Sequence, residues 1–246
     1  MNDTSAKPLS IFSAVFKLLT FRLSQSEFLQ LDGRHLAFGL ACTWLVGIGR
    51  FWDHPNAKLF QYLGLGSVAY VFALSVFLWL IIWPLRPDNW SFLNLLTFIT
   101  LVSPPALLYA IPVEQWFQLE TAARINLWFL LVVAVWRVAL LWFFLVRYGG
   151  LGGEVVSATL WPLSLIVAVL TVLKLDAKVL QMMAGIERGA PSAEDEVNMA
   201  LRIITGFSQL LWLPLLLLYG SAIRARRSRR REAELAKNSP PDDDAT

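Results

Sequence analysis

The sequence predicts an all-helical bundle embedded in a membrane, with about six spans. Its 246 residues are 57% hydrophobic and only 16% charged, and the mean hydropathy is +0.56. A soluble domain averages about 25% charged residues. Long apolar stretches with few or no charges recur along the chain, and a helix needs roughly 20 apolar residues to cross a bilayer core of about 30 Å. The backbone in lipid must bond within its own segment, which favours helices, and the continuous apolar runs disfavour a β-barrel.

Residues 1–34 are predicted to form a cytoplasmic or interfacial segment that contains an amphipathic helix. Apolar side chains recur there at spacings of three and four, which is the helical period. They are Leu9, Phe12, Phe16, Leu19 and Leu23. Charged residues follow soon afterwards, which favours a helix lying in the membrane interface. A packed cytosolic cap on the bundle is the alternative.

Residues 35–223 are predicted to form the transmembrane bundle. The predicted spans are 35–51, 59–85, 90–111, 125–146, 155–173 and 203–223. The first span is short, and five spans with a re-entrant first segment is the main rival. Gly39, Thr43 and Gly47 fall four residues apart within it. Small residues on one face allow another helix to approach closely, so these three predict a packing surface.

Arg137, near the middle of the fourth predicted span, is the most unusual residue. A charge at this depth costs at least about 2.5–3.5 kcal/mol and needs acceptors. Pro104 and Pro105 remove helical hydrogen bonds from the preceding span, so we predict that Arg137 donates to carbonyl groups at this break. The hydroxyls of Thr100 and Ser103 are expected to contribute. The interpretations are a polar clasp between helices, a ligand site for an anion or lipid headgroup, or a side chain that snorkels to the surface.

Residues 224–246 are predicted to be a basic, then acidic, disordered cytoplasmic tail. The basic run directly follows the last span, where cations set topology and attract anionic lipid headgroups. It comprises Arg224, Arg226, Arg227, Arg229, Arg230 and Arg231. An even number of spans then places the N-terminus in the cytoplasm too. This pattern fits a bacterial inner (plasma) membrane, and nucleic acid is not an expected partner.

The sequence contains no motif for catalysis, a metal or a cofactor, so none of these is predicted. Metal-ligand clusters, a nucleophile elbow and a phosphate-binding loop are all absent. The favoured function is a scaffold, assembly or regulatory subunit that acts through helix and loop contacts with lipids, a membrane protein partner or copies of itself. The alternative is a small transporter or channel with a midplane site at Arg137 and the Pro104-Pro105 break. A membrane enzyme acting on lipid is disfavoured.

Overall fold

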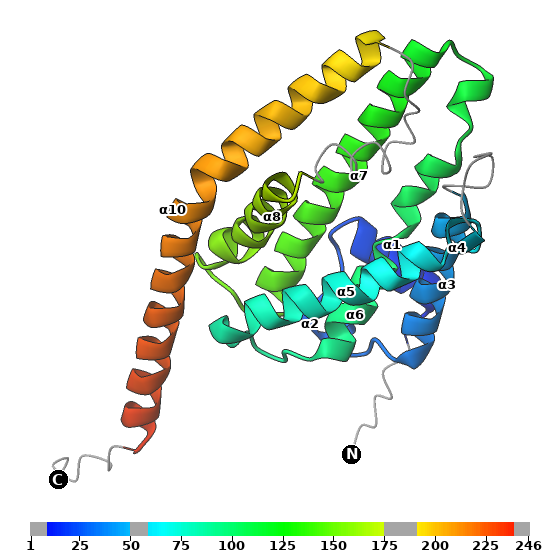
Figure 1. Ribbon diagram of the computed structural model, residues 1–246. Helices are drawn as coiled ribbons and strands as arrows, with labels where there is room; N and C mark the ends of the chain where they lie inside the picture. Colours follow the sequence, from blue (N-terminus) through cyan, green and yellow to red (C-terminus); the bar gives the residue numbers. More distant parts are fainter. Residues whose placement is uncertain (1–8, 50–58, 175–190, 239–246) are drawn as a thin grey trace, which may run out of the picture.

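A computed structural model describes residues 9–49, 59–174 and 191–238, and these contain helices and no strands. Figure 1 shows α10 along one side of the molecule next to α8, with α3 and α6 on the other side and α7 between them. The helices in chain order are α1 (Ile11–Leu19), α2 (Gln25–Phe28), α3 (Gly33–Gly49), α4 (Leu59–Tyr62), α5 (Leu65–Ile82), η1 (Trp83–Leu85), α6 (Phe92–Leu101), η2 (Pro104–Ala110), η3 (Val113–Gln115), α7 (Leu119–Arg147), α8 (Val155–Val172) and α10 (Pro191–Asn238).

Four helical segments in the described residues are long and apolar enough to cross a membrane, and a bent pair of helices makes a fifth. The four are Leu65–Leu85, Arg124–Arg147, Val155–Val172 and Ile203–Ala236. The fifth is α6 with η2, which meet at an angle of 42°. The chain is therefore a candidate multi-pass membrane protein. The first predicted span corresponds to α3, whose 17 residues extend only about 25 Å at 1.5 Å per residue, short of a bilayer core.

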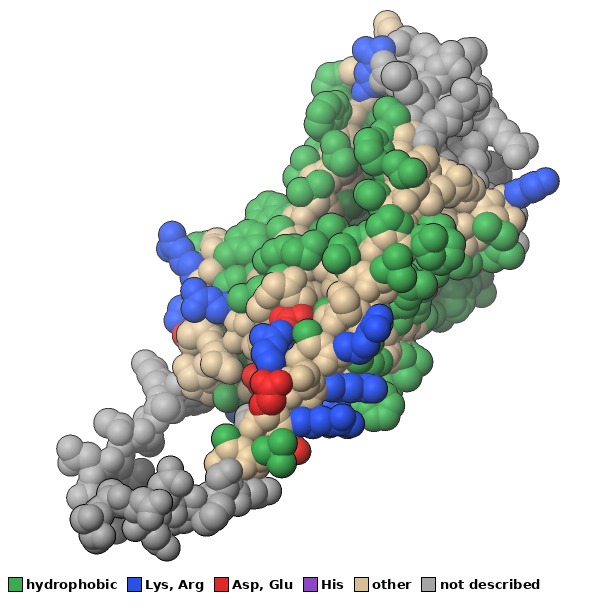
Figure 2. All heavy atoms as spheres, turned by 90° about the vertical axis from the view of Figure 1, so that its left-hand side faces the viewer, with side chains coloured by type: hydrophobic (Ala, Val, Ile, Leu, Met, Phe, Trp, Pro, Cys, Tyr) green, Lys and Arg blue, Asp and Glu red, His purple; other side chains and the backbone are tan. Residues whose placement is uncertain are grey.

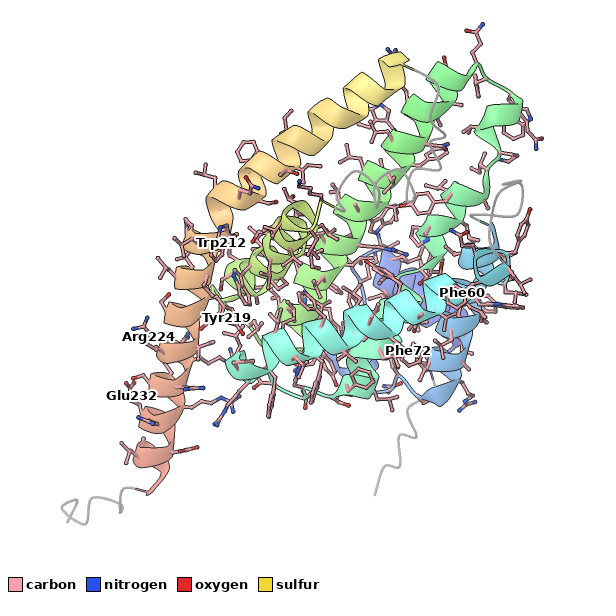
Figure 3. All side chains as sticks on the ribbon, in the orientation of Figure 1. Phe60, Phe72, Trp212, Tyr219, Arg224 and Glu232 are labelled. Atoms are coloured by element: carbon pink, nitrogen blue, oxygen red, sulfur yellow. The ribbon has the colours of Figure 1, made fainter. Side chains whose placement is uncertain are left out.

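The break between α6 and η2 follows from the two prolines. The α-helix ends at Leu101, and a 3-10 helix begins at Pro104. Proline lacks a backbone N–H and its ring clashes with the preceding turn, so the α-helical ladder cannot continue. By contrast, α8 continues through Pro162 and α10 through Pro214. In Figure 3, α10 changes direction near the labelled Trp212, as expected close to a proline.

The N-terminal segment packs on the bundle through one face. Ala14 and Leu18 of α1 are fully buried, while Phe12 and Phe16 on its other face are 75% and 63% exposed. The indole of Trp136 donates a hydrogen bond to the Leu19 carbonyl at 3.1 Å. Because Trp136 lies halfway along the apolar part of α7, the end of α1 lies well inside the length of the bundle. The end of α1 is thus packed against α7, while its outer face remains apolar.

The main core lies where α5, α6, α7 and α8 meet. Phe98, Phe144 and Tyr148 stack in sequence, with ring centroids 4.2 Å and 5.0 Å apart. Phe28 from α2 packs edge-on against Phe144 at 5.5 Å. Burial of aromatic rings contributes strongly to packing energy, so this stack anchors the N-terminal segment to α6 and α7.

Candidate functional site: Arg137 and the broken helix

Arg137 lies on the buried face of α7. Leu130, Val133, Leu140 and Phe144 share that face at helical spacing and are all buried. The side chain of Arg137 is partly buried, and its Nε donates a long hydrogen bond of 3.4 Å to the Val102 carbonyl. The structure therefore brings Arg137 to the break between α6 and η2.

The acceptor is Val102 because of the local backbone geometry. In an α-helix the Val102 carbonyl would accept from the N–H of Ala106. Here that N–H donates instead to the Ser103 carbonyl, at 2.9 Å, in the tighter 3-10 pattern. The sequence predicts different acceptors, the carbonyls of Thr100 and Leu101, which the prolines release from their helical bonds. The change of helix type exposes the next carbonyl instead.

The hydroxyls of Thr100 and Ser103 do not bond to Arg137. Thr100 Oγ1 donates to the Thr97 carbonyl of its own helix at 2.9 Å. Ser103 Oγ bonds to Thr43 Oγ1 at 2.7 Å, and Thr43 Oγ1 also lies 2.9 Å from the Gly39 carbonyl. These groups form a separate buried polar link between α3 and the end of α6.

Two tyrosines for which the sequence predicts no role are electrostatic neighbours of the Arg137 guanidinium. They are Tyr70 of α5 and Tyr109 of η2. Tyr109 follows the two prolines within the same apolar segment, which is the only sequence signal that links it to the break. A guanidinium has five N–H donors, so a carbonyl and phenolic oxygens can surround it without a carboxylate.

The small residues of α3 lie where neighbouring elements come very near its backbone. A Cβ built on Gly39 would lie 2.4 Å from Thr100 Oγ1, and one on Gly47 would lie 2.6 Å from the Gly64 carbonyl oxygen. Thr43 lies between them and is buried. The structure thus places Gly39, Thr43 and Gly47 together on a face against α6 and the start of α5.

The basic run divides into two sets on α10. Arg226 and Arg230 lie 3.7 Å and 3.3 Å from the Asp88 carboxylate, and Arg229 pairs with the buried Glu154. The other arginines share a second, exposed face; they are Arg224, Arg227 and Arg231. Figure 2 shows the acidic side chains and most of the basic ones in the lower part of this face, beneath a largely apolar surface.

The first part of the tail is helical, whereas the sequence predicts disorder for residues 224–246. Helix α10 continues to Asn238, and residues 239–246 lie outside the described residues. Arginine, alanine and glutamate are good helix formers, and the pairs with Asp88 and Glu154 hold this part of α10 against the turns after α5 and α7. Sequence reasoning missed both acids, although Asp88 directly follows a predicted span and Glu154 closes a glycine-rich turn.

A further polar cluster lies at the start of α3, outside the apolar segments. The Asp32 carboxylate lies 2.8 Å from Nδ1 of the buried His35. This hydrogen bond, assisted by the backbone N–H groups of His35 and Arg34, lowers the pKa of Asp32 to about 2. The carboxylate therefore caps α3 in its charged form.

Within the described ranges, no group of three or more His, Cys, Asp or Glu side chains is placed to hold a metal ion. Comparison with protein-family models, with curated protein sequences and with solved structures finds no match to this chain.

Proposed function

We propose that this chain is a non-catalytic integral membrane component that acts as a scaffold, assembly or regulatory subunit through helix and loop contacts. The observation that carries this proposal is the orientation of the Arg137 side chain. Its guanidinium turns inward to the Val102 carbonyl at the helix break, so the charged residue in the middle of the apolar part of α7 joins this helix to the end of α6. A buried polar group that fixes helix pairing is a structural device.

The surface of α10 supports a role in contacts with other membrane components. Its apolar half packs chiefly on α8, and leucines on its outer side remain open. Leu210 and Leu217 are 70% and 64% exposed, whereas Leu215 faces the bundle and is 8% exposed. An outer apolar surface of this kind can face lipid or a partner helix.

We also infer six crossings with the N-terminus and the basic half of α10 on the cytoplasmic side, in a membrane such as the bacterial inner membrane. The short helix α3 supports this count because it lies along the whole broken helix. Gly39 is beside Thr100, Thr43 bonds to Ser103, and Gly49 is beside Ala110. The basic residues of α10 then follow the positive-inside rule.

The test is purification of the tagged full chain in mild detergent, with mass spectrometry of the proteins that copurify. We expect a second protein in fixed stoichiometry, and Leu217→Ala to weaken its retention while the folded yield is unchanged. Leu215→Ala is the matched control, which should lower the folded yield instead. A single homogeneous species containing only this chain would overturn the assembly role.

The alternative function is a small transporter or channel, and the broken helix beside Arg137 favours it specifically. Discontinuous helices line substrate sites in transporters, and Arg137 uses one of its five N–H donors in the bond to Val102. Arg137→Leu distinguishes the two functions. A clasp predicts a loss of folded protein in the membrane, whereas a transport site predicts a folded protein with altered flux into liposomes, and partial activity in Arg137→Lys.

A further inference from the structure

The outer face of α7 carries an open apolar groove of about 780 Å³. Its floor is the face of α7 opposite Arg137, and Phe21 from the turn after α1 forms a wall. The lining residues are Phe21, Ala134, Val135, Val138, Ala139, Trp142, Phe143, Val146 and Arg147. Arg147 is the only charged member of this lining, and it stands at one end.

The length and position of the groove match one leaflet of a bilayer. Ala134 lies near the middle of the apolar segment Arg124–Arg147, and Arg147 closes that segment. The helix between Ala134 and Arg147 is roughly 20 Å long at 1.5 Å per residue. One leaflet contributes about 15 Å of hydrocarbon, followed by its headgroup layer. The groove therefore has about the length of one lipid acyl chain with its headgroup, and its α7 lining is confined to the half of the segment that ends at Arg147.

Two cations at the headgroup end have no carboxylate partner among the described residues. Arg147 and Arg22 are both exposed, and Arg22 directly follows the groove residue Phe21. Neither forms an ion pair with any residue in the described part of the chain. Basic side chains at the end of an apolar surface attract anionic headgroups.

The backbone conformation of Phe21 is a second observation that supports a functional role for this wall of the groove. Its φ is 59°, in the left-handed region that glycine adopts without steric cost. Phe21 N–H bonds to the Leu18 carbonyl and Arg22 N–H to the Lys17 carbonyl, which is the helix-ending motif in which glycine is preferred. The phenylalanine instead places its ring edge-on to Phe143, with centroids 5.7 Å apart. Strain at one residue is often retained where it shapes a site.

We propose that this groove binds one anionic phospholipid of the leaflet at the basic end of the bundle. One acyl chain lies along α7 from Arg147 to Ala134, against Phe21 and Trp142. The phosphate accepts hydrogen bonds from Arg147 and is attracted by Arg22. This site is separate from the Arg137 break, because it occupies the opposite face of α7.

Native mass spectrometry of the full chain with added phosphatidylglycerol, and with phosphatidylcholine of the same acyl chains, tests the proposal. We expect one tightly retained phosphatidylglycerol per chain. Arg147→Gln removes a charged hydrogen-bond donor to the phosphate, so phosphatidylglycerol should bind about tenfold more weakly. Phosphatidylcholine has the same phosphate, but its quaternary ammonium offsets the charge, so its weaker binding should fall by a smaller factor. Arg227→Gln, an exposed arginine of α10 outside the groove, is the matched control and should leave the tightly bound lipid unchanged.

The groove itself is tested by two variants that act on its apolar part. Val138→Phe fills the groove, and Phe21→Gly removes its wall while relieving the backbone of the turn, so the second variant should keep its thermal stability. Both should weaken retention of both lipids. Lipid binding that is unchanged in these variants and in Arg147→Gln overturns the proposal. So does a benzophenone amino acid at position 138 that cross-links in native membranes to a polypeptide instead of a lipid.

Discussion

Gly39 is a position where the backbone of α3 lies very close to α6, and alanine there should force the two helices apart. The added Cβ would lie 2.4 Å from Thr100 Oγ1, 2.7 Å from Thr100 Cβ and 3.0 Å from the backbone carbonyl carbon of Thr100. Rotation of the Thr100 side chain can relieve the first contact. It cannot relieve the other two, because those atoms are set by the backbone of α6.

The size of the effect follows from two opposing terms. Overpacking a well-filled contact costs about 1–3 kcal/mol, while replacing glycine by alanine inside a helix contributes about 1 kcal/mol of stability. Gly206 of α10 provides the matched control, since a Cβ there meets nothing within 4 Å. Gly206→Ala carries the same gain in helix propensity without the overpacking. The difference between the two variants should therefore be about 1–3 kcal/mol, which isolates the helix contact.

The assay is the fraction of full chain that remains folded after heating in mild detergent, measured by size-exclusion chromatography. Gly39→Ala should have a lower midpoint temperature than Gly206→Ala, and Gly206→Ala should match or exceed the parent protein. Equal midpoints for the two variants would refute the close approach of α3 to α6. They would also remove the support that this helix pair provides for a sixth crossing.

Three further predictions concern the polar groups outside the apolar segments. The lowered pKa of Asp32 means that its charged form stabilises the fold above about pH 4, and that this contribution is lost as pH falls towards 2. Asp32→Asn should therefore make the unfolding midpoint less dependent on pH in that range. Ser24 caps α2 with its side chain and Ser10 makes no such bond at α1, so Ser24→Ala should cost about 1 kcal/mol and Ser10→Ala much less, by the same thermal assay. Glu154→Gln should weaken the bond to Arg229, and amide hydrogen exchange in the basic part of α10 should accelerate about tenfold; unchanged exchange would contradict the docking of this helix on the turn.

Around Arg137, the sequence predicts the helix break and the need for acceptors, but not which groups act as acceptors. The cost of an intramembrane charge and the disruption caused by two adjacent prolines are local properties, so the sequence predicts both an arginine that needs acceptors and the helix break. The identity of the acceptor depends on the 3-10 pattern that follows the break, which exposes Val102. The positions of Tyr70 and Tyr109 depend on how α5 and η2 pack around α7, and no local pattern specifies that packing.

For the basic run and the N-terminal helix, too, the sequence predicts the type of segment but not the residues that it contacts. Their composition indicates a cationic segment after the last span and an amphipathic helix before the first. Whether the arginines face lipid or protein depends on Asp88 and Glu154, which lie far from them in sequence. The indole of Trp136 likewise determines where α1 ends against the bundle.

The sequence by itself determined that this protein is helical and has segments apolar enough to cross a membrane, because hydrophobicity and backbone hydrogen bonding act along each segment separately. It also determined where a helix must break, since proline acts on its own turn. Only the tertiary structure decided which polar groups meet and which face of α7 is left open as a groove. Those outcomes depend on the approach and rotation of whole helices, to which residues distant in the chain contribute together.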